Sequence, residues 1–433
     1  MVVTKFGGSS LSCATQFAKV KNIIESDPNR CVVVASALGK RDSNDTKITD
    51  LLYILHAHLK FNVTYADIWK MIYDRFVGVR DELGIKYDIN KDLDSLKAEL
   101  NKNISQDYLV SRGEYLTSKL LAAYLGFKFV DAKDLLIFNF DGKMDNLKTE
   151  NNVKAAFQEY GKIVVPGFYG SFPNGTLHLL SRGGSDVTGS ILAKCINASL
   201  YENWTDVSGI LAADPRIVKN PKAIKEITYA ELRELSYMGA SVLHEETVFP
   251  VQELNIPINL KNTNDPSHPG TTIKNVSQDE SSIITGLAGK KDFISFNITK
   301  DHMSNEVGFL RKALSVFEKY NVSIEHVPSG IDSISVVCAN DAVEKVKYEI
   351  ITDLKNDLAA DVSLESNIAL VAVVGRNMAK HSGVCAKVFQ TLGEAGINIK
   401  LLAQGPEELN IIIGVDSADY EKTISAIYDK MIG

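Results

Sequence analysis

Two short stretches of this chain place paired glycines beside charged side chains, a combination that suits phosphate binding. The first is KFGGSS at residues 5–10, and the second is RGGSD at residues 182–186. Because glycine has no Cβ, the backbone N–H groups of such turns can close on an anion at the start of a helix. The ammonium of Lys5 can reach the same anion, so the first stretch favours a nucleotide-phosphate site. The G-x-x-x-x-G-K-[ST] loop occurs nowhere in the sequence.

Each stretch also has a plainer interpretation when it is taken alone. The first fits a tight turn, and the second fits a helix capped by Ser185 or Asp186. The repetition of the Gly-Gly turn, with Arg182 beside it, weakens the plainer interpretation of both. A third candidate is Glu114 in SRGE, expected in the first turn of a helix, where a carboxylate often only compensates the helix dipole.

The elements that must position these residues alternate between strand and helix. This alternation predicts one α/β domain over residues 1–265. Short apolar runs, typical of parallel strands covered on both faces, lie at 2–6, 30–35, 127–131 and 162–168. The region from 50 to 125 is expected to be a helical excursion. The polar turn that starts at Ser36 follows one strand directly, and ligands of open α/β sheets bind at such ends.

The remainder of the chain predicts a linker and two copies of one motif. Residues 266–282 are polar and carry no period, so they are expected to form a linker. Counting elements then gives βαββαβ once over 293–365 and again from 368, where the last strand is missing. The spare strand at 283–288 is expected to complete the second copy. The second unit would then comprise 283–288 plus 368–433, with the first unit inserted in it.

Composition excludes several classes of function. The chain has 433 residues, 45% of them hydrophobic, and a net charge of −7, which allows two or three cores. It has neither a long basic run nor an apolar run of about twenty residues, so we expect no nucleic-acid partner and no membrane span. Five dispersed cysteines predict reduced thiols and a cytoplasmic location, and no signal peptide is expected. His56 and His58 point to different sides of a helix, which indicates a structural role and no metal site.

Six stretches resemble, in order, the motifs of one family. They are KFGGSSL (5–11), SRGE (111–114), RGGSD (182–186), WTDVSGILAADPR (204–216), GASVLH (239–244) and IPINLKNT (256–263). The chain resembles the aspartate kinases, which belong to the amino-acid kinase family and carry C-terminal tandem ACT domains. The resemblance covers nearly the whole chain. It implies an αβα sandwich with a mostly parallel sheet, followed by two ferredoxin-like ACT units.

The resemblance also implies a reaction. The γ-phosphoryl group of ATP, bound with Mg²⁺, passes to the side-chain carboxylate of L-aspartate to give 4-phospho-L-aspartate. This is the first step of lysine, threonine and methionine biosynthesis. Because the nucleophile is already an anion at neutral pH, catalysis needs positioning and charge neutralisation and no general base.

The resemblance assigns the catalytic roles to Lys5 and Asp186. The substrate-binding residues that it implies are Ser36, Thr49, Glu114, Arg182 and Ser185. Arg182 would fork onto the α-carboxylate of aspartate, and Glu114 would pair with its α-ammonium. The ATP-binding residues that it implies are Lys5, Gly7, Gly8, Ser9, Thr205, Asp206, Leu211, Arg216, Ser241 and Val242.

The ACT resemblance implies feedback inhibition by an end-product amino acid, in a homodimer or homotetramer formed through the ACT domains. The effector-binding residues that it implies are Met303, Glu306, Val307, Gly308, Phe309, Leu310, Glu325, Ser329, Gly330, Ile331 and Asp332. Glu325 and Asp332 offer carboxylates for a cation, which favours lysine as the effector, while threonine stays open.

Two other functions compete with this interpretation. One is another kinase of the same fold, acting on glutamate or N-acetylglutamate, against which the ACT pair and the RGGSD stretch count. The other is an amino-acid sensor with an inactive kinase domain. The four residues Lys5, Glu114, Arg182 and Asp186 count against the sensor, because an inactive site need not keep them.

Overall fold

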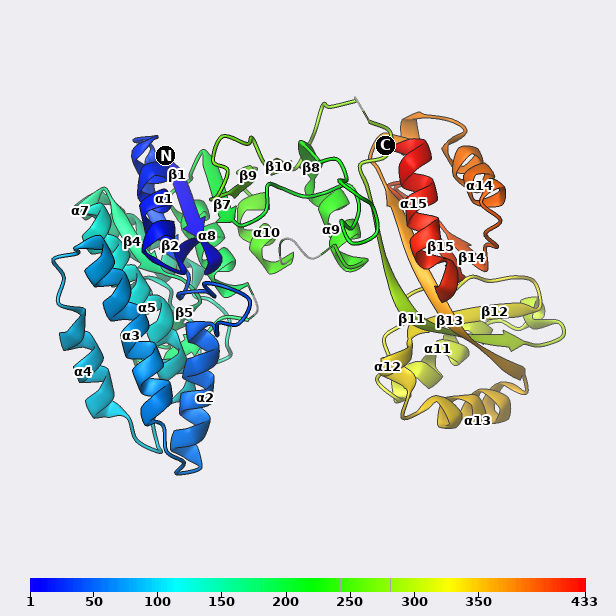
Figure 1. The fold of residues 1–433 in the computed structure, drawn as a ribbon. Coiled ribbons are helices and arrows are strands. Elements are labelled where there is room, and N and C mark those ends of the chain that lie inside the picture. Colours follow the sequence, from blue (N-terminus) through cyan, green and yellow to red (C-terminus); the bar gives the residue numbers. More distant parts are fainter. Residues whose placement is uncertain (182, 241–242, 244, 281) are drawn as a thin grey trace. The chain divides into compact units, whose positions relative to one another are not determined.

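The computed structural model describes residues 1–433 apart from Arg182, Ser241, Val242, His244 and Ser281. The chain divides into two compact units, and each is described by itself (Figure 1). The first unit comprises Met1–Ile210, Ala223–Tyr229 and Val242–Ser277. The second unit comprises Leu211–Lys222, Ala230–Ser241 and Gln278–Gly433.

The first unit is organised around an eight-stranded sheet in the order β3-β4-β2-β1-β7-β9-β10-β8. Its strands are β1 (Val2–Phe6), β2 (Arg30–Ala35), β3 (Lys128–Phe129), β4 (Ile163–Pro166), β7 (Leu200–Thr205), β8 (Glu226–Thr228), β9 (Ile258–Asn262) and β10 (Thr271–Lys274). Neighbouring strands are parallel except for β9 and β10. The predicted mostly parallel sheet is therefore confirmed. Its central strands are buried, which explains their continuous apolar runs.

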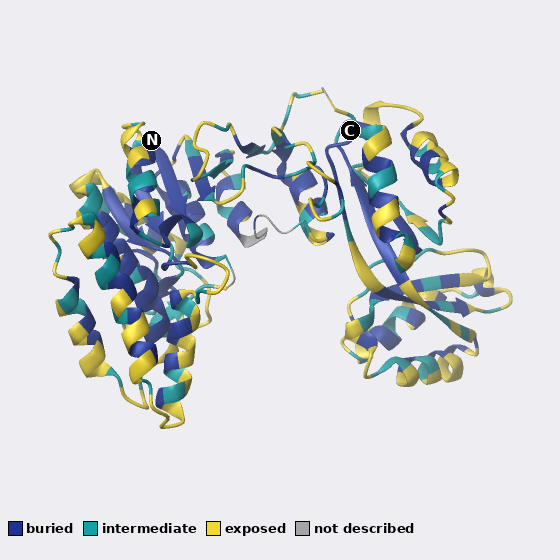
Figure 2. Ribbon diagram, in the orientation of Figure 1, coloured by how far each residue is buried: buried dark blue, intermediate teal, exposed yellow. Residues whose placement is uncertain are grey.

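Helices cover both faces of this sheet, which confirms the predicted αβα sandwich. On one side lie α1 (Ala14–Glu25), α2 (Ile48–Lys60), α3 (Ala66–Leu83), α4 (Ile89–Glu99) and α5 (Gln106–Leu125). On the other side α8 (Gly184–Cys195) packs on β1, β2 and β7, and also contacts α7 (Asn146–Tyr160) and α10 (Glu245–Gln252). Figure 2 shows the strands in the dark blue of buried residues and the outward sides of the helices mainly in yellow.

The helix that carries SRGE begins earlier than predicted. Glu114 was expected in the first turn, but α5 begins at Gln106, after Ser105, whose side chain accepts a hydrogen bond from the N–H of Tyr108. Ser105 supplies the capping hydroxyl, so the serine of SRGE is an interior residue. Glu114 consequently lies in the middle of a buried helix face, and a role in compensating the helix dipole is excluded.

The expected linker contains a strand. Residues 271–274 form β10, which pairs with both β8 and β9. Its side chains alternate between buried and half-buried, but four residues are too few to show a period in the sequence. The first compact unit extends to Ser277, beyond the boundary expected at residue 265. Residues 211–222 and 230–241 belong to the second unit, which sequence patterns did not indicate.

The second unit contains a five-stranded antiparallel sheet in the order β12-β11-β13-β15-β14. Its strands are β11 (Gly286–Thr299), β12 (Ser333–Ala339), β13 (Asp361–Val374), β14 (Leu401–Ala403) and β15 (Asn410–Asp416). Residues 286–290 of β11 pair with 370–374 of β13, the part of β13 that also pairs with β15. The strand near 283–288 thus completes the second repeat, which confirms that the first repeat is inserted in it.

Each long central strand serves both repeats. The strands expected at 283–288 and 293–298 join in β11, with a register shift between Lys290 and Phe293. The strands expected at 361–365 and 368–374 join in β13 in the same way. Residues 322–327, where the βαββαβ pattern of the first repeat requires a strand, form only the isolated bridge of His326 with Val337.

Helices pack on this second sheet in pairs. They are α11 (Phe309–Lys319) with α13 (Lys347–Leu358) in the first repeat, and α14 (Val384–Glu394) with α15 (Tyr420–Met431) in the second. The core of the first repeat places side chains of α11 and α13 against β11 and β12. A further helix, α9 (Tyr229–Tyr237), belongs to the second unit from residue 230 onward.

Candidate active site

The carboxyl ends of adjacent parallel strands bring the predicted residues of the first unit to one edge of the sheet. Gly7, directly after β1, donates its N–H to the carbonyl of Trp204 on β7 at 2.9 Å. Ser36, directly after β2, donates its N–H to the carbonyl of Phe6 at 3.2 Å. Thr263, after β9, bonds in the same way to the last residue of β7 at 2.8 Å. The turns after these strands are therefore fixed side by side at the ligand-binding edge of the sheet.

Lys5 and Asp186, the two predicted catalytic residues, are in direct contact. Lys5 Nζ lies 2.6 Å from Asp186 Oδ1, and the two side chains are 9% and 19% exposed. Asn203 donates its side-chain N–H to the same oxygen at 2.9 Å. A Cβ placed on Gly7 would stand 3.5 Å from Lys5 Nζ, so the ammonium lies over the Gly-Gly turn. A nearly buried cation, a turn without Cβ atoms and the first turn of α8 meet here, which is the donor set expected for a phosphate group.

The start of α8 depends on glycine. Gly183 has φ of 76° and caps the helix in the left-handed conformation, which an L side chain rarely adopts. A Cβ on Gly184 would stand 2.6 Å from Cδ2 of Phe168, in the turn after β4. Ser185, a predicted substrate-binding residue, follows in the first turn and is buried. The left-handed φ of Gly183 and the close approach of Gly184 to the turn after β4 thus explain the two glycines of this stretch.

Phe168 is a residue of this edge that the sequence did not reveal. Its φ of 77° is unusual for a bulky side chain, and strain of this kind concentrates at functional sites. Hydrogen bonds hold it on both sides, because its N–H donates to Thr188 Oγ1 at 3.1 Å and its carbonyl accepts from the N–H of Leu180 at 2.8 Å. The Pro-Gly pair that ends β4 was the available signal.

The turn between β2 and α2, residues 36–48, is called the substrate turn below. It lies directly on the turn after β1, residues 7–12, which is called the phosphate turn. Gly39 donates its N–H to the carbonyl of Gly8 at 2.9 Å, and a Cβ on Gly39 would stand 2.4 Å from the carbonyl carbon of Gly8. At the far end of the turn, the N–H of Ile48 bonds to the carbonyl of Leu38 at 3.1 Å. Ser36 and Thr49, predicted to bind substrate, therefore flank a single compact turn.

Glu114 projects from α5 toward this same turn. The backbone N–H of Ala37 hydrogen-bonds its carboxylate, but Oε2 has no hydrogen-bond partner among the described residues. Burial raises the pKa of Glu114 to about 8, against the opposing effects of that hydrogen bond and of the Arg112 charge. A buried carboxylate oxygen without a partner suits an ammonium group of a ligand, as the resemblance implied.

The remaining predicted ATP-binding residues of the first unit are Ser9, Thr205 and Asp206. Ser9 begins the short 3₁₀ helix at Ser9–Leu11, immediately after the Gly-Gly turn. Thr205 ends β7, and its hydroxyl donates to Asp206 Oδ1 at 3.1 Å. These three residues follow β1 and β7, which are neighbours in the sheet.

The other residues predicted for this site are either outside the described residues or part of the second unit. Arg182, Ser241 and Val242 lie outside the described residues. Leu211 and Arg216 belong to the second unit, where Arg216 is exposed and pairs with Asp214 at 2.6 Å. Their predicted contacts with ATP therefore stay predictions.

The predicted effector residues occupy the first repeat of the second unit. Met303 and Phe309 are buried, whereas Val307 is 98% exposed. Gly308, with φ of 83°, caps α11 in the left-handed conformation. The N–H of Lys300 bonds to the carbonyl of Asp332 at 3.0 Å, which joins the start of this loop to the loop at residues 329–332.

Two carboxylates of this set already have partners. Glu306 lies 2.6 Å from the ammonium groups of both Lys300 and Lys312, and the hydrogen bonds from these lysines lower its pKa to about 2. Glu325 accepts a hydrogen bond from the hydroxyl of Tyr237, on α9, at 2.6 Å. Burial and this bond together raise the pKa of Tyr237 to about 12.

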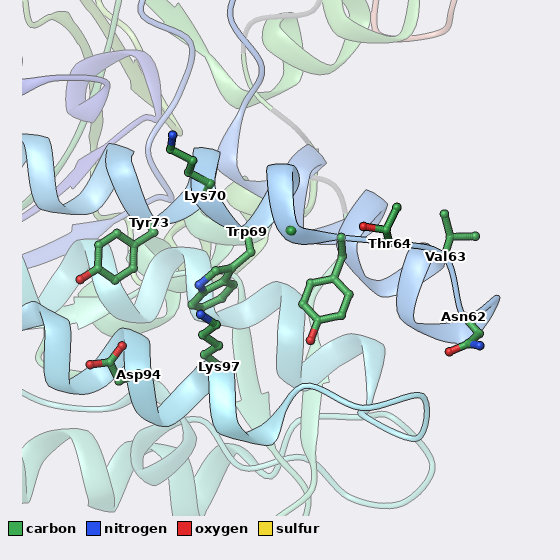
Figure 3. Close-up of a pocket in the computed structure, with 10 residues that line it drawn as sticks. Asn62, Val63, Thr64, Trp69, Lys70, Tyr73, Asp94 and Lys97 are labelled. Carbon is green, nitrogen blue, oxygen red and sulfur yellow. The ribbon is translucent and has the colours of Figure 1, made fainter.

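A groove of about 750 Å³ lies elsewhere on the first unit. Figure 3 shows Trp69, Tyr73 and Lys97 along it, on α3 and α4. None of the predicted site residues lines this groove. His56 and His58 each contact a backbone carbonyl, as expected of structural histidines. Among the described residues, no group of three His, Cys, Asp or Glu side chains could hold a metal, and no described helix has the length and apolarity to cross a bilayer.

A parallel sheet with two glycine turns at its carboxyl edge defines a phosphate-binding α/β domain, and comparison with known proteins gives the family. Residues 1–262 match the amino acid kinase family, and residues 371–431 match an ACT domain. The chain belongs to the amino acid kinase family. It is 37% identical to aspartokinase 3 of Bacillus subtilis, over 99% of this chain and 98% of that protein.

Solved structures agree with this assignment. The aspartate kinase of Clostridium acetobutylicum is 48% identical with a TM-score of 0.93, and all of both chains is covered. Aspartokinase III of Escherichia coli is 26% identical with a TM-score of 0.75, again over both whole chains. That enzyme has been solved with aspartate and ADP and with lysine and aspartate. The resemblance to aspartate kinases drawn from the sequence is therefore confirmed.

Proposed function

We propose that the chain is an ATP-dependent aspartate kinase, which transfers the γ-phosphoryl group of ATP to the side-chain carboxylate of L-aspartate. The observation that carries the proposal is the Lys5–Asp186 pair over the Gly-Gly turn, 2.6 Å apart. The unpartnered Oε2 of Glu114, at the neighbouring turn, adds a place for an amino group. Aspartate and ADP bound to the Escherichia coli relative support the same pair of substrates. The product, 4-phospho-L-aspartate, begins lysine, threonine and methionine biosynthesis.

The residues of the edge divide the work of this reaction. The attacking carboxylate of aspartate is ionised at neutral pH, so no side chain has to remove a proton. Lys5 neutralises negative charge on the phosphoryl group, and the N–H groups of the Gly-Gly turn orient it. Asp186 holds the ammonium of Lys5 in place. Glu114 takes the α-ammonium of aspartate, which fixes the orientation of the nucleophile.

We propose that Mg²⁺ enters with ATP. When bound, it supplies positive charge to the phosphate oxygens. Mg²⁺ in kinases usually takes one or two protein carboxylates besides phosphate and water. Asp186, which is at the turn that holds the phosphates, suits such a role through Mg²⁺-bound water.

For regulation, we propose inhibition by lysine in a homodimer or homotetramer formed through the ACT repeats. Glu306 is neutralised by two lysine side chains, so Glu325 and Asp332 are the acidic groups that would take the effector's cationic side chain or amine. The lysine complex of the Escherichia coli relative supports lysine, and threonine is the alternative. The free cysteines of the described structure suit the predicted cytoplasmic location.

One assay tests both the reaction and the effector. Purified protein is incubated with ATP, Mg²⁺ and L-aspartate, and hydroxylamine traps the acyl phosphate as a hydroxamate. We expect aspartate-dependent hydroxamate that lysine suppresses. Suppression by threonine alone would retain the kinase and overturn lysine as the effector. Product with glutamate and none with aspartate would favour another kinase of this fold, and no product with either would favour the sensor.

A further inference from the structure

Arg75 is a buried cation whose contacts join three segments of the candidate active site. It lies on α3 and is 6% exposed. Its Nη2 donates to the carbonyl of Gly39 at 2.6 Å and to the carbonyl of Ser12 at 3.2 Å. Its Nη1 donates to Asp45 Oδ2 at 2.8 Å. A rigid guanidinium fork can satisfy these acceptors together, which the single ammonium of a lysine cannot do.

These acceptors belong to the turns that hold the predicted substrates. Ser12 closes the phosphate turn, because its hydroxyl donates to the carbonyl of Ser9 at 3.1 Å. Gly39 is bonded to Gly8 in the same phosphate turn. Asp45 lies near the end of the turn between β2 and α2, four residues before Thr49. Arg75 therefore fastens both ends of the substrate turn to the end of the phosphate turn.

The turn that Arg75 holds also determines where Glu114 meets the substrate. Ala37 hydrogen-bonds the Glu114 carboxylate through its backbone N–H. Arg75 bonds the carbonyl of Gly39, two residues further along. Displacement of this turn would shift the groups around the amino end of aspartate relative to the phosphate turn.

Asp45 is held between two guanidinium groups. Arg41 donates to its carboxylate from the backbone N–H, Nε and Nη2, and Arg75 donates to Oδ2, which also accepts from Arg41. Burial raises the pKa of Asp45, but the bonds from Arg41 and the charge of Arg75 more than reverse this and hold it well below its usual range. The carboxylate is thus ionised at neutral pH, and the pair with Arg75 is a true ion pair.

We propose that Arg75, with Asp45, is a positioning residue for phosphoryl transfer. It touches neither predicted substrate. It sets the distance between the phosphate turn at residues 7–12 and the substrate turn at residues 36–48, and the proposal rests on the aspartate kinase activity proposed above. A pair with a purely structural role would contribute to stability and leave the geometry of the two turns unchanged when it is weakened.

The test compares R75K with a matched control, R30K. Arg30 forms a two-bond fork with Glu202, with bonds of 2.8 and 2.9 Å, at the opposite end of β2 from the substrate turn, and its side chain is 11% exposed against 5% for Arg75. Both variants keep the charge and lose the fork, so both are expected to lower the melting temperature to a similar extent. D45N is the second variant, for use if R75K does not fold.

R75K is expected to lower kcat/KM for aspartate about a hundredfold, the scale expected when reacting groups are displaced by about 1 Å. R30K is expected to stay within about twofold of the wild type at a temperature where both variants are folded, because the hydrogen bonds of the Arg30 side chain go to Glu202, Ile23 and Ser26, which lie outside both turns. D45N should change kcat/KM in the same direction as R75K. Equal kinetic losses in R75K and R30K, or wild-type kinetics in R75K and D45N, would overturn the proposal.

A second measurement needs no substrate and separates this proposal from the proposed function. Amide hydrogen exchange at residues 37–47 is expected to be faster in R75K than in R30K and the wild type, because the turn has lost its anchor. Equal exchange in all three proteins would overturn the positioning role even if the wild type made no hydroxamate. An inactive wild type with the expected exchange would instead count against the kinase alone.

Discussion

At the scale of single residues, Lys5 and Glu114 show two opposite ways of placing charge at a site. The ammonium of Lys5 is nearly buried, and the adjacent carboxylate of Asp186 neutralises its charge. Glu114 is a buried carboxyl that no cation compensates directly, and its pKa rises accordingly. The ammonium of Lys5 is already positioned to bind a phosphate group, whereas the ionised form of Glu114 is stabilised most by a ligand that brings positive charge.

Removal of the Lys5 ammonium is expected to abolish catalysis and to leave the second unit unaffected. Lys5→Ala should lower kcat by at least about 10²–10³-fold, because a preorganised charge at the transition state is lost. Hydroxamate formation measures this change. Lysine binding, measured by calorimetry, should be retained, and its loss would show that the substitution disturbs more than the active site.

Glu114 is expected to make both stability and aspartate binding depend on pH. Its carboxyl has a pKa of about 8 when folded and about 4.3 when unfolded, so the folded state holds the extra proton between these values. The contribution of Glu114 to the free energy of unfolding therefore falls as pH rises from about 4.3 to 8, and it is constant above pH 8. Glu114→Gln should gain stability relative to the wild type over this range, by a few kcal/mol, on the order of 1.4 per pKa unit.

Calorimetry supplies the complementary measurement on the wild type. Aspartate binding below pH 8 should release a proton as Glu114 ionises beside the ammonium, so the observed enthalpy should vary with the ionisation enthalpy of the buffer. In Glu114→Gln this buffer dependence should disappear. A variant that kept it would assign the proton to another group.

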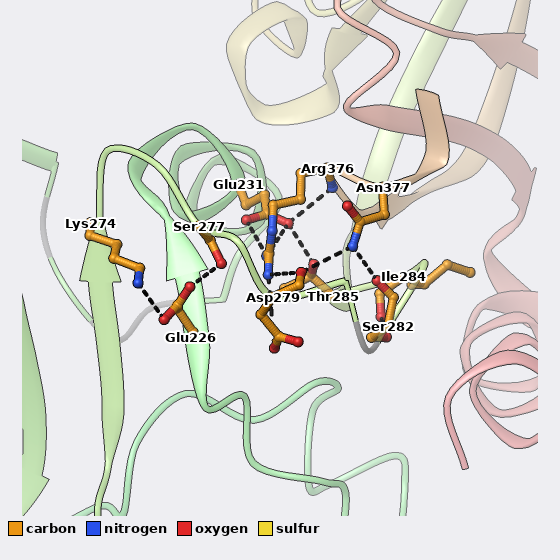
Figure 4. Close-up of polar contacts among 10 residues, drawn as sticks. All are labelled: Glu226, Glu231, Lys274, Ser277, Asp279, Ser282, Ile284, Thr285, Arg376 and Asn377. Carbon is orange, nitrogen blue, oxygen red and sulfur yellow. Dashed lines mark hydrogen bonds and ion pairs between the residues drawn. The ribbon is translucent and has the colours of Figure 1, made fainter. Parts of the chain in front are cut away.

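At the scale of elements, polar contacts at both ends of α9 join it to the ACT repeats of the second unit. Figure 4 shows the carboxylate of Glu231 facing Arg376 and Thr285. Arg376 NH1 lies 2.9 Å from Glu231 Oε2, and the Thr285 hydroxyl donates to Oε1 at 2.5 Å. Tyr237, at the end of the same helix, bonds Glu325. The helix therefore contacts residues of both ACT repeats.

Removal of the Glu231 carboxylate should destabilise the second unit strongly. The side chain is fully buried, and Glu231→Ala removes the shorter of the two ion pairs of the Arg376 guanidinium, at a cost of about 3–5 kcal/mol. Thermal unfolding followed by circular dichroism measures the effect. Glu421→Ala, which breaks the exposed pair with Lys291, is the control and should change stability little. Equal effects of the two substitutions would contradict the expectation.

The positions of elements could be predicted where they depend on local sequence signals, and not where they depend on packing between distant segments. The glycine turns after β1 and before α8 follow from backbone sterics, whereas the shared role of Lys5 and Asp186 was expected from the family resemblance. The start of α5 was misplaced, because Ser105 and the serine of SRGE offer the same capping hydroxyl. Phe168 was missed although the Pro-Gly pair before it offered a local signal, and Arg75 was missed because its buried carbonyl acceptors come together only when distant segments meet.

At the scale of the whole molecule, Glu325 is expected to affect inhibition by the effector and to leave the uninhibited catalytic rate unchanged. Glu325→Ala should raise the lysine concentration for half-inhibition by about tenfold or more, since a charge-assisted hydrogen bond contributes about 1.5–3 kcal/mol. The rate without lysine should be unchanged. Glu318→Ala, on the exposed face of α11 in the same repeat, is the matched control, and an unchanged inhibition curve in Glu325→Ala would contradict the effector site.

The number and order of the strands in the second unit could be counted from the sequence, but their fusion could not. The predicted strands stop at Ala288 and resume at Phe293, because residues 290–292 between them are exposed and charged. Backbone pairing continues past this break with only a shift of register. Local hydrophobicity therefore indicates two separate repeats, whereas the backbone hydrogen bonds between β11 and β13 join them.

The continuous strands β11 and β13 limit how this protein can be redesigned. A regulatory module that can be exchanged needs ends that lie outside its sheet, and here a cut at either border of the first repeat would sever a strand that the second repeat also uses. Grafting a foreign ACT repeat would therefore have to reproduce the register of both strands. If the proposed effector site is correct, a change of effector specificity is more accessible through substitutions in the loops at residues 300–308 and 325–332, which leave the shared ladder intact.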